Sequence, residues 1–497
     1  NNAGGCLLIK LRLTEFKHQP GKRAFPMHHV PGVRDRKRIS GLYGLVFPAC
    51  ALTLVLQLSA CSGRQISSSI QIYAFRPIKA VFSLGDETRF KFQTIDVVSD
   101  RRGRLLLLFL KHDLASGKKL GTFFRITSDG GASFGPERTL PQPLSRDAGF
   151  AGAQLLFFRG GLAAICVLTA GGGRNLFYSQ SNTDGETWSE PVQINDEQES
   201  VLGVFHFVQP SQGDIYCVWP DRRRGFSLVI FSASHDGGRT WSPNQVLEYD
   251  FREGEQTAPI LLTGTGNRLL AFWVDARDRQ TLRDIRSSYS DDAGRHWSPS
   301  HRVNDDNEHV WQGLSTAVAR GNQIFVAFED FREPGEAGDN DWNIYFAKSE
   351  DNGRTWAKNI RLNDVQAGED SHPFLTVDEL GRLYCVWRSS RGSIFGDIYV
   401  SQSADGDSWS RAIKINEGDQ MLFRRPLSPL SLANGKLLCH WIEQEPGNDE
   451  FHLTWLEPIS TPTSAETPVP INAQRNSLSV TEREMLFADD FSIGKDT

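Results

Sequence analysis

The chain has 497 residues, of which 39% are hydrophobic and 23% charged, and it contains 12 Trp, 31 Phe and 45 Gly. This composition excludes a disordered chain and a polytopic membrane protein, and it favours short aromatic strands joined by tight turns. The net charge is −6, and residues 1–60 hold nine Lys and Arg against two acidic residues, so the remaining chain is acidic and a general nucleic-acid-binding role is disfavoured.

A basic segment and an apolar run lie near the start of the chain. Residues 34–38 read RDRKR, residues 42–58 are apolar, and the run ends in Leu-Ser-Ala-Cys61. This arrangement resembles a bacterial lipoprotein signal, which implies that Cys61 becomes the lipid-bearing first residue of the mature protein. A transmembrane anchor is the alternative, although 17 residues interrupted by Pro48 are short for a membrane span. Ser62 in place of an Asp implies, by resemblance to Gram-negative lipoproteins, a location at the outer membrane or cell surface.

These features divide the start of the chain. If Met27 is the initiating residue, residues 1–26 are an upstream segment, residues 27–60 the signal peptide and residues 61–69 a tether. Residues 70–82 then read as a strand that precedes the repeats described next.

One octet recurs six times, with its closing aromatic residues 53 to 59 positions apart. The copies are 127–134 (TSDGGASF), 181–188 (SNTDGETW), 234–241 (SHDGGRTW), 290–297 (SDDAGRHW), 349–356 (SEDNGRTW) and 402–409 (QSADGDSW). The pattern Ser-x-Asp-x-Gly-x-Thr-Trp resembles the Asp-box, or BNR repeat, of sialidases. The resemblance implies an all-β protein, a sialidase-like Asp-box β-propeller of four-stranded antiparallel blades over residues 70–457.

The boxes themselves are predicted to be structural, because turn chemistry accounts for each of their fixed positions. The residues concerned are Asp129, Asp236, Asp292 and Asp351 with Trp188, Trp241, Trp297, Trp356 and Trp409.

A second signature, a turn Gly or Asn followed by an apolar strand, follows the same period and occurs seven times, from Gly103 to Gly435. The last unit has no box of its own, so we expect residues 70–82 to supply its missing outer strand and to close the ring. Seven blades are therefore favoured, and six blades, as in sialidases, remain the alternative.

The cysteines and acidic loops show no complete metal-binding pattern. Cys166, Cys217, Cys385 and Cys439 occupy the same phase of four units, too far apart for disulfides, and are predicted core thiols. Calcium at residues 305–308 or 339–341 is conceivable, but both loops lack a full ligand spacing. We therefore expect no metal and no other cofactor.

One face of the propeller, called here the top face, is predicted to carry the loops between the second and third strands and the loops that join successive blades. These loops are rich in Asp-x-Arg, whose local pairing would pin each loop, and in Arg and Trp residues that suit binding of an anion or a glycan. The candidate ligand-binding residues are Arg222, Arg277, Arg332, Arg388, Arg391, Arg424 and Trp311.

The chain departs from sialidases at two catalytic positions. Gln93 replaces the arginine of the family's Arg-Ile-Pro motif, and no Tyr follows Tyr399 to serve as nucleophile. The resemblance therefore implies an exported propeller that binds a glycan or a cell-surface protein without ordinary sialidase catalysis. The alternative is a sialidase-like glycoside hydrolase that uses top-face carboxylates. The candidate carboxylates are Asp113, Asp221, Asp275, Asp330 and Glu443.

After the repeats, residues 458–482 are rich in Ser, Thr and Pro and read as a linker. Residues 483–497 resemble the opening strand of a concanavalin-like β-sandwich. We expect a monomer that is attached to the membrane through Cys61 and has no nucleic-acid partner.

Overall fold

A computed structural model describes residues 74–76 and most of residues 89–457. Within the second range it leaves out 101–102, 130–132, 141–148, 159, 171–172, 199, 203–204, 212, 249–253, 279–280, 308–309, 334–341, 364–367, 392–395, 417–422, 427–429, 432–436 and 446–447. The chain separates into Asn1–Ser67 and Ser68–Thr497, and the described residues belong to the second unit. The predicted signal peptide, Cys61, the linker and the segment after it lie outside the described residues.

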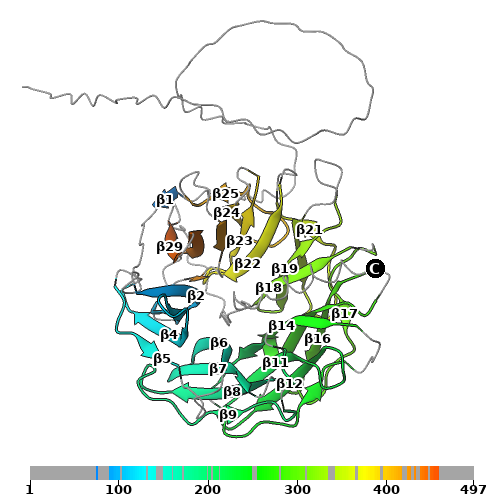
Figure 1. Cartoon of the computed structure of the whole chain (residues 1–497). Coiled ribbons are helices and arrows are strands. Elements are labelled where there is room, and N and C mark those ends of the chain that lie inside the picture. The colour runs from blue at the N-terminus through cyan, green and yellow to red at the C-terminus, as the bar shows by residue number, and fades with distance from the viewer. Residues whose placement is uncertain are drawn as a thin grey trace, which may run out of the picture. The chain divides into compact units, whose positions relative to one another are not determined.

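The described residues form seven antiparallel sheets arranged around a centre (Figure 1), six with four strands and one with five. We number them blades 1 to 7 in chain order. Blade 1 consists of β2 (Phe90–Ser99), β3 (Leu105–Asp113), β4 (Lys119–Thr127) and β5 (Arg138–Thr139), and blade 2 of β6 (Gly149–Phe158), β7 (Gly161–Ala170), β8 (Gly173–Ser181) and β9 (Val192–Gln193). Blade 3 consists of β10 (His206–Val208), β11 (Ile215–Asp221), β12 (Leu228–Ser234) and β13 (Gln245–Val246). Blade 4 consists of β14 (Gln256–Thr263), β15 (Leu269–Asp275), β16 (Asp284–Ser290) and β17 (His301–Arg302).

The last three blades complete the ring of sheets. Blade 5 consists of β18 (Gln312–Arg320), β19 (Gln323–Asp330), β20 (Asn343–Ser349) and β21 (Ile360–Arg361). Blade 6 consists of β22 (Asp370–Val377), β23 (Leu383–Ser389), β24 (Asp397–Ser403) and β25 (Ile413–Lys414). Blade 7 consists of β26 (Phe423–Pro426), β27 (Leu430–Ser431), β28 (Leu437–Glu445) and β29 (Asn448–Glu457) together with β1 (Ala74–Arg76). A single 3₁₀ turn, η1 (Thr265–Asn267), is the only helical element of the described residues. No described helix is long and apolar enough to cross a membrane.

The N-terminal strand closes the last sheet, as the sequence predicts. β1 pairs antiparallel with β29, placing Ala74 opposite Glu457 and Arg76 opposite Trp455. The inner edge of the same sheet is divided between β26 and β27, which both pair with β28. β2 lies against β29, so blades 7 and 1 are neighbours. The all-β propeller with an N-terminal closing strand is confirmed, and the sheets number the seven that were favoured.

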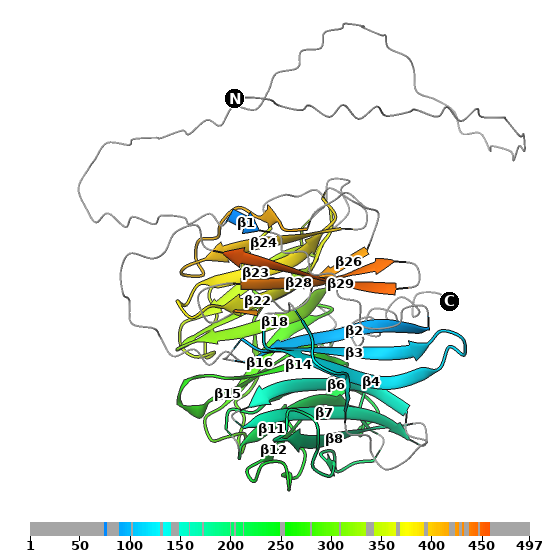
Figure 2. The same ribbon diagram turned by 90° about the vertical axis from the view of Figure 1, so that its left-hand side faces the viewer.

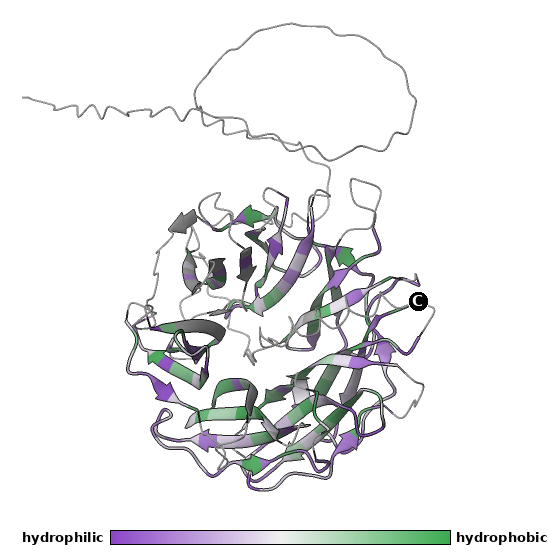
Figure 3. Cartoon of the chain, in the orientation of Figure 1, coloured by the Kyte–Doolittle hydropathy of each residue, from purple (hydrophilic) through white to green (hydrophobic). Residues whose placement is uncertain are grey.

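Successive sheets face one another around the ring (Figure 2), and apolar residues recur along their strands (Figure 3). These residues form the core between facing blades. One cluster joins blades 4 and 5 and includes Phe272 and Phe328, both fully buried. Further clusters join blades 1 and 2, 2 and 3, 3 and 4, 5 and 6, and 6 and 7. The four predicted core cysteines are buried and form no disulfide, and burial raises the pKa of Cys166 to about 12.

Each Asp-box is a turn between the third and fourth strands. Asp236 accepts the backbone N–H groups of Arg239 at 3.0 Å and Thr240 at 2.9 Å, and the Thr240 hydroxyl at 2.7 Å. These hydrogen bonds, the one from the Thr240 side chain foremost, lower the pKa of Asp236 to about 2. Trp241 packs edge-on against Tyr178 of the preceding blade, with ring centroids 5.8 Å apart. The box therefore joins adjacent blades as well as forming its own turn.

Candidate functional site

A buried carboxylate lies at the top of the second strand in blades 3 and 4. Trp219 donates its indole N–H to Asp221 at 3.1 Å, and Trp273 donates to Asp275 at 2.9 Å. Both aspartates are at most 2% exposed. The tryptophan two residues earlier on the same strand face thus fixes the orientation of each carboxylate.

Blades 6 and 7 build the same contact from different positions. In blade 7 the indole of Trp441 donates to Glu443 at 3.1 Å. In blade 6 the second strand ends in Ser389, and the indole of Trp387 donates instead to Asp370 of β22 at 2.9 Å. The carboxylate has moved to the neighbouring strand and kept its hydrogen-bond donor.

Four arginines, called here the staple arginines, each contact a carboxylate of their own blade and one of the preceding blade. They are Arg223 with Asp221 and Asp196, Arg277 with Asp275 and Glu248, Arg332 with Asp330 and Asp305, and Arg424 with Glu443 and Asp397. Their side chains are between 1% and 14% exposed. The predicted local Asp-x-Arg pairing is therefore present in blades 3, 4 and 5, and it extends across each blade boundary.

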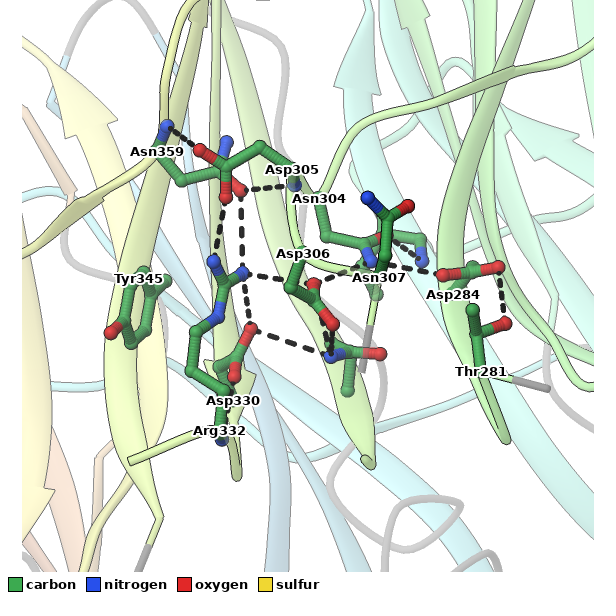
Figure 4. A network of polar contacts seen from close by, with 12 residues as sticks. Thr281, Asp284, Asn304, Asp305, Asp306, Asn307, Asp330, Arg332, Tyr345 and Asn359 are labelled. Carbon is green, nitrogen blue, oxygen red and sulfur yellow. Dashed lines mark hydrogen bonds and ion pairs between the residues drawn. The ribbon is translucent and has the colours of Figure 1, made fainter. Parts of the chain in front are cut away.

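Figure 4 shows the staple between blades 4 and 5, in which Arg332 contacts more than two carboxylates. Arg332 lies 2.6 Å from Asp330, 2.6 Å from Asp305 and 3.1 Å from Asp306. The backbone N–H of Asn359 donates to Asp305 at 2.9 Å, and that of Asp305 donates to the Asn359 side chain at 2.8 Å. Three carboxylates thus surround one guanidinium group.

Burial and crowding of negative charge perturb this group of residues. Burial, partly offset by Arg332 and reinforced by the charge of Asp306, raises the pKa of Asp330 to about 6. By contrast, the pKa of Asp275 lies below its usual range, because Arg277 and Trp273 outweigh the effect of burial.

The loop considered for calcium at residues 305–308 is part of this staple. Asp305 and Asp306 face Arg332, which already supplies a positive charge to both. Glu308 and residues 339–341 lie outside the described residues. Among the residues that are described, no group of three or more His, Cys, Asp or Glu has an arrangement that suits a metal ion.

Other predicted residues lie apart from the staples. Asp113 accepts the backbone N–H and the hydroxyl of Ser116 at 2.8 and 2.7 Å, an arrangement typical of a turn. Trp311 lies under the guanidinium group of Arg283 at 4.2 Å. Arg222 has a 60% exposed side chain, and its neighbour Arg223 is the staple. The spacing of Asp275 and Arg277, repeated in Asp330 and Arg332, would have identified Arg223 rather than Arg222 as the arginine that pairs with Asp221.

The two remaining arginines lie on β23 and just beyond it. Arg391 donates to the Ser389 hydroxyl at 2.9 Å, lies 3.6 Å from Asp370 and stacks on the Tyr399 ring at 4.1 Å. Arg388, 7% exposed, donates to Ser371 at 3.3 Å. On this side of the ring the described residues therefore place Arg391 beside a carboxylate and Arg388 beside a hydroxyl.

A Glu and a His that the sequence analysis did not single out lie next to Arg388. The backbone N–H of His372 donates to Glu329 of blade 5 at 2.6 Å, and the His372 Nδ1 lies 3.9 Å from the same carboxylate oxygen. His372 follows Ser371 directly on β22. No local motif marks these residues, because Glu329 and His372 are 43 positions apart and meet only when blades 5 and 6 pack together.

The repeat region matches a known family model. Residues 213–439 match the model of the BNR repeat-like domain. No curated protein sequence gives a significant match.

Solved structures of several carbohydrate-active proteins resemble this chain. An ulvan lyase, a polysaccharide lyase, has a TM-score of 0.52 at 11% identity over 73% of this chain and 93% of its own. The α-L-arabinofuranosidase Arb93A from Fusarium graminearum has a TM-score of 0.43 at 15% identity over 62% and 92% of the two chains. The NanB sialidase from Streptococcus pneumoniae has a TM-score of 0.41 at 12% identity over 77% and 70%. At this level of identity the likeness concerns the fold alone.

Proposed function

Because this chain is a sialidase-like BNR-repeat propeller, we propose that it binds carbohydrate on its top face without the sialidase reaction. The observation that carries the proposal is a break in the repeat. Blades 3, 4, 5 and 7 use their top-face arginines as staples, whereas blades 5 and 6 add Glu329, His372 and Arg388, which belong to none of them. A ligand site needs different residues from successive blades, and a structural repeat does not.

The candidate catalytic carboxylates support binding more than bond cleavage. Asp221, Asp275 and Glu443 are each held by an arginine and a tryptophan indole. Carboxylates held in buried ion pairs are poor acids and poor nucleophiles.

A second candidate function is the sialidase-like glycoside hydrolase. Its supporting observation is Asp330, because a pKa of about 6 suits a general acid. Against it, Asp330 is fully buried and contacts Arg332.

A glycan array probed with the purified protein, followed by hydrolysis assays on each glycan that binds, tests both candidates. Binding without hydrolysis is the expected result. Turnover that Asp330→Asn abolishes would establish the hydrolase instead, and failure to bind any glycan, with capture of a protein partner, would refute carbohydrate binding.

The cellular location belongs to the same proposal. The basic segment, the apolar run and Leu-Ser-Ala-Cys61 support lipid attachment at Cys61 and a location at the outer membrane or cell surface of a bacterium. A propeller tethered in this way would present its binding face to glycans or proteins outside the cell, and we propose that it does so as a monomer.

A further inference from the structure

One position of the second strand distinguishes blades 5 and 6 from the others. In blades 3, 4, 5 and 7 this position lies between an aromatic residue and the carboxylate that contacts the staple arginine, and in blade 6 it lies between Trp387 and Ser389. Because side chains alternate along a strand, its side chain points to the opposite face from these two neighbours. The residues at this position are Pro220, Val274, Glu329, Arg388 and Ile442 in blades 3 to 7. Only blades 5 and 6 of these five carry a charge there, although Glu329 is 3% and Arg388 7% exposed. A buried charge needs compensating partners, so two unrepeated charges distinguish the boundary of blades 5 and 6 from the other blade boundaries.

The two charged side chains contact adjacent residues of β22. Glu329 accepts the backbone N–H of His372, and Arg388 donates to the hydroxyl of Ser371, which is opposite Arg388 in the sheet register. The side chain of His372 remains 18% exposed. The cluster of Glu329, Ser371, His372 and Arg388 therefore contains a carboxylate, a hydroxyl, an imidazole and a guanidinium group, and solvent reaches the imidazole.

The backbone of β22 does not explain these residue types. His372 has a φ of 56° and precedes a proline, and the register of β22 shifts around it. Ala258 of β14 has a φ of 49°, also precedes a proline and lies at the same register shift of blade 4. The left-handed residue is thus a property of the repeat that an alanine satisfies, so histidine at position 372 is not required by the fold.

Two glycines make room for the charged side chains. A Cβ at position 313 would lie 2.8 Å from the Glu329 Oε2 atom, and a Cβ at position 396 would collide with the guanidinium of Arg388. Gly396 also has a positive φ of 78°, which a larger residue adopts only with strain.

The charges around Arg388 decide which ligand suits the cluster. Carboxylates of Glu369, Glu329 and Asp370 all act on this one guanidinium group. Arg391 lies 3.6 Å from Asp370, so three carboxylates face two guanidinium groups and the local charge still opposes an anionic ligand. A sugar carboxylate or sulfate is therefore a poor ligand here. A neutral sugar meets no such penalty, because its hydroxyls both donate to a carboxylate and accept from a guanidinium or imidazole.

We propose that Glu329, His372 and Arg388 bind adjacent hydroxyls of a neutral sugar, with Glu329 accepting and His372 and Arg388 donating hydrogen bonds. This inference rests on the proposed carbohydrate binding and names its ligand class. It departs from recognition of an acidic sugar, and it places the site at the boundary of blades 5 and 6.

The test compares two ligand panels by isothermal titration calorimetry with the full-length protein. One panel contains neutral pentose and hexose oligosaccharides, and the other contains oligosaccharides of similar length with uronic or sialic acid residues. We expect tighter binding of a neutral ligand. Glu329→Gln should weaken that binding about tenfold, because a charge-assisted hydrogen bond becomes a neutral one, and should improve binding of the acidic panel.

Glu255→Gln is the matched control, since it removes the same charge from an exposed residue of the top rim. Glu255→Gln should change binding of neither panel, and melting curves should show that both variants are folded at the temperature of the titrations. Preferential binding of acidic ligands, or neutral binding that Glu329→Gln leaves unchanged, would overturn this inference while leaving carbohydrate binding intact. Failure of both panels to bind the wild type would instead overturn the proposed function.

Discussion

Arg424 of β26 lies 3.1 Å from Asp397 of the preceding blade and 2.9 Å from Glu443 of its own blade. Its side chain is 1% exposed, so two buried carboxylates share one buried cation. In the other three staples the arginine comes from the loop after the second strand, whereas here it comes from the inner strand. The charge arrangement is thus kept although the residue that supplies it has changed position, which indicates a structural requirement of the blade boundary.

Removing a staple arginine should destabilise the fold. Arg277→Ala leaves Asp275 buried without its cation, and breaking such a pair costs about 3–5 kcal/mol. Arg222→Ala, on an exposed side chain one blade earlier, should change the free energy of unfolding by less than about 0.5 kcal/mol. Urea denaturation of both variants measures the difference. Equal stabilities would show that the staple has no structural role.

The box tryptophans should matter for stability and not for ligand binding. Trp241→Ala and Trp356→Ala each remove an aromatic ring packed on the preceding blade, and we expect a loss of about 3–5 kcal/mol. Thermal melting checks this expectation, and melting temperatures within error of the wild type would contradict it.

Stability should depend on pH through the buried acids. The pKa values of Asp330 and Asp370 are both raised to about 6, in each case chiefly by burial, so the folded state favours their protonated forms. The folded state then binds protons that the unfolded chain does not, and these two groups add stability as the pH falls from about 7 to about 4.

The variant Asp330→Asn should lack the part of this increase in stability at low pH that protonation of Asp330 provides. Denaturation curves of wild type and variant at pH 7 and pH 5 provide the comparison, with Asp275→Asn as the contrasting case. The pKa of Asp275 is lowered, so its contribution is present at both pH values and is lost only in stronger acid. A wild type and Asp330→Asn with identical changes between pH 7 and pH 5 would contradict the raised pKa.

The protein should not hydrolyse sialosides by the sialidase mechanism. Gln93 offers a neutral amide where the family has an arginine, and no tyrosine follows Tyr399. A fluorogenic sialoside assay with the purified protein should therefore show no turnover above background. Turnover that substitution of one top-face carboxylate abolishes would refute this expectation.

Lipid attachment should depend on one thiol. Metabolic labelling of bacterial cells with a fatty-acid analogue should mark the wild-type protein and leave Cys61→Ala unlabelled. Equal labelling of the two proteins would exclude Cys61 as the attachment site.

The sequence predicts the fold far better than the site. Turn residues and aromatic residues recur at a fixed spacing, and such local chemistry reveals the boxes, the blades and the strand near Ala74 that closes the ring. The residues proposed to bind a ligand have no such spacing. The tryptophan indole of the second strand donates to Asp221 of the same strand in blade 3 but to Asp370 of the neighbouring strand in blade 6. Glu329 contacts His372 only because blades 5 and 6 pack together. Contacts of this kind depend on distances between distant segments, which no local pattern encodes.

The pairing of Ala74 with Glu457 also constrains how the chain folds. Among the described strands, β1 comes first in the chain and β29 last, so their pairing has the longest sequence separation and a correspondingly high loop-closure cost. Until it forms, β29 presents an open edge that can pair with another chain. Shortening the chain past Arg76 would leave that edge open permanently, and aggregation, rather than loss of a single contact, would be its consequence.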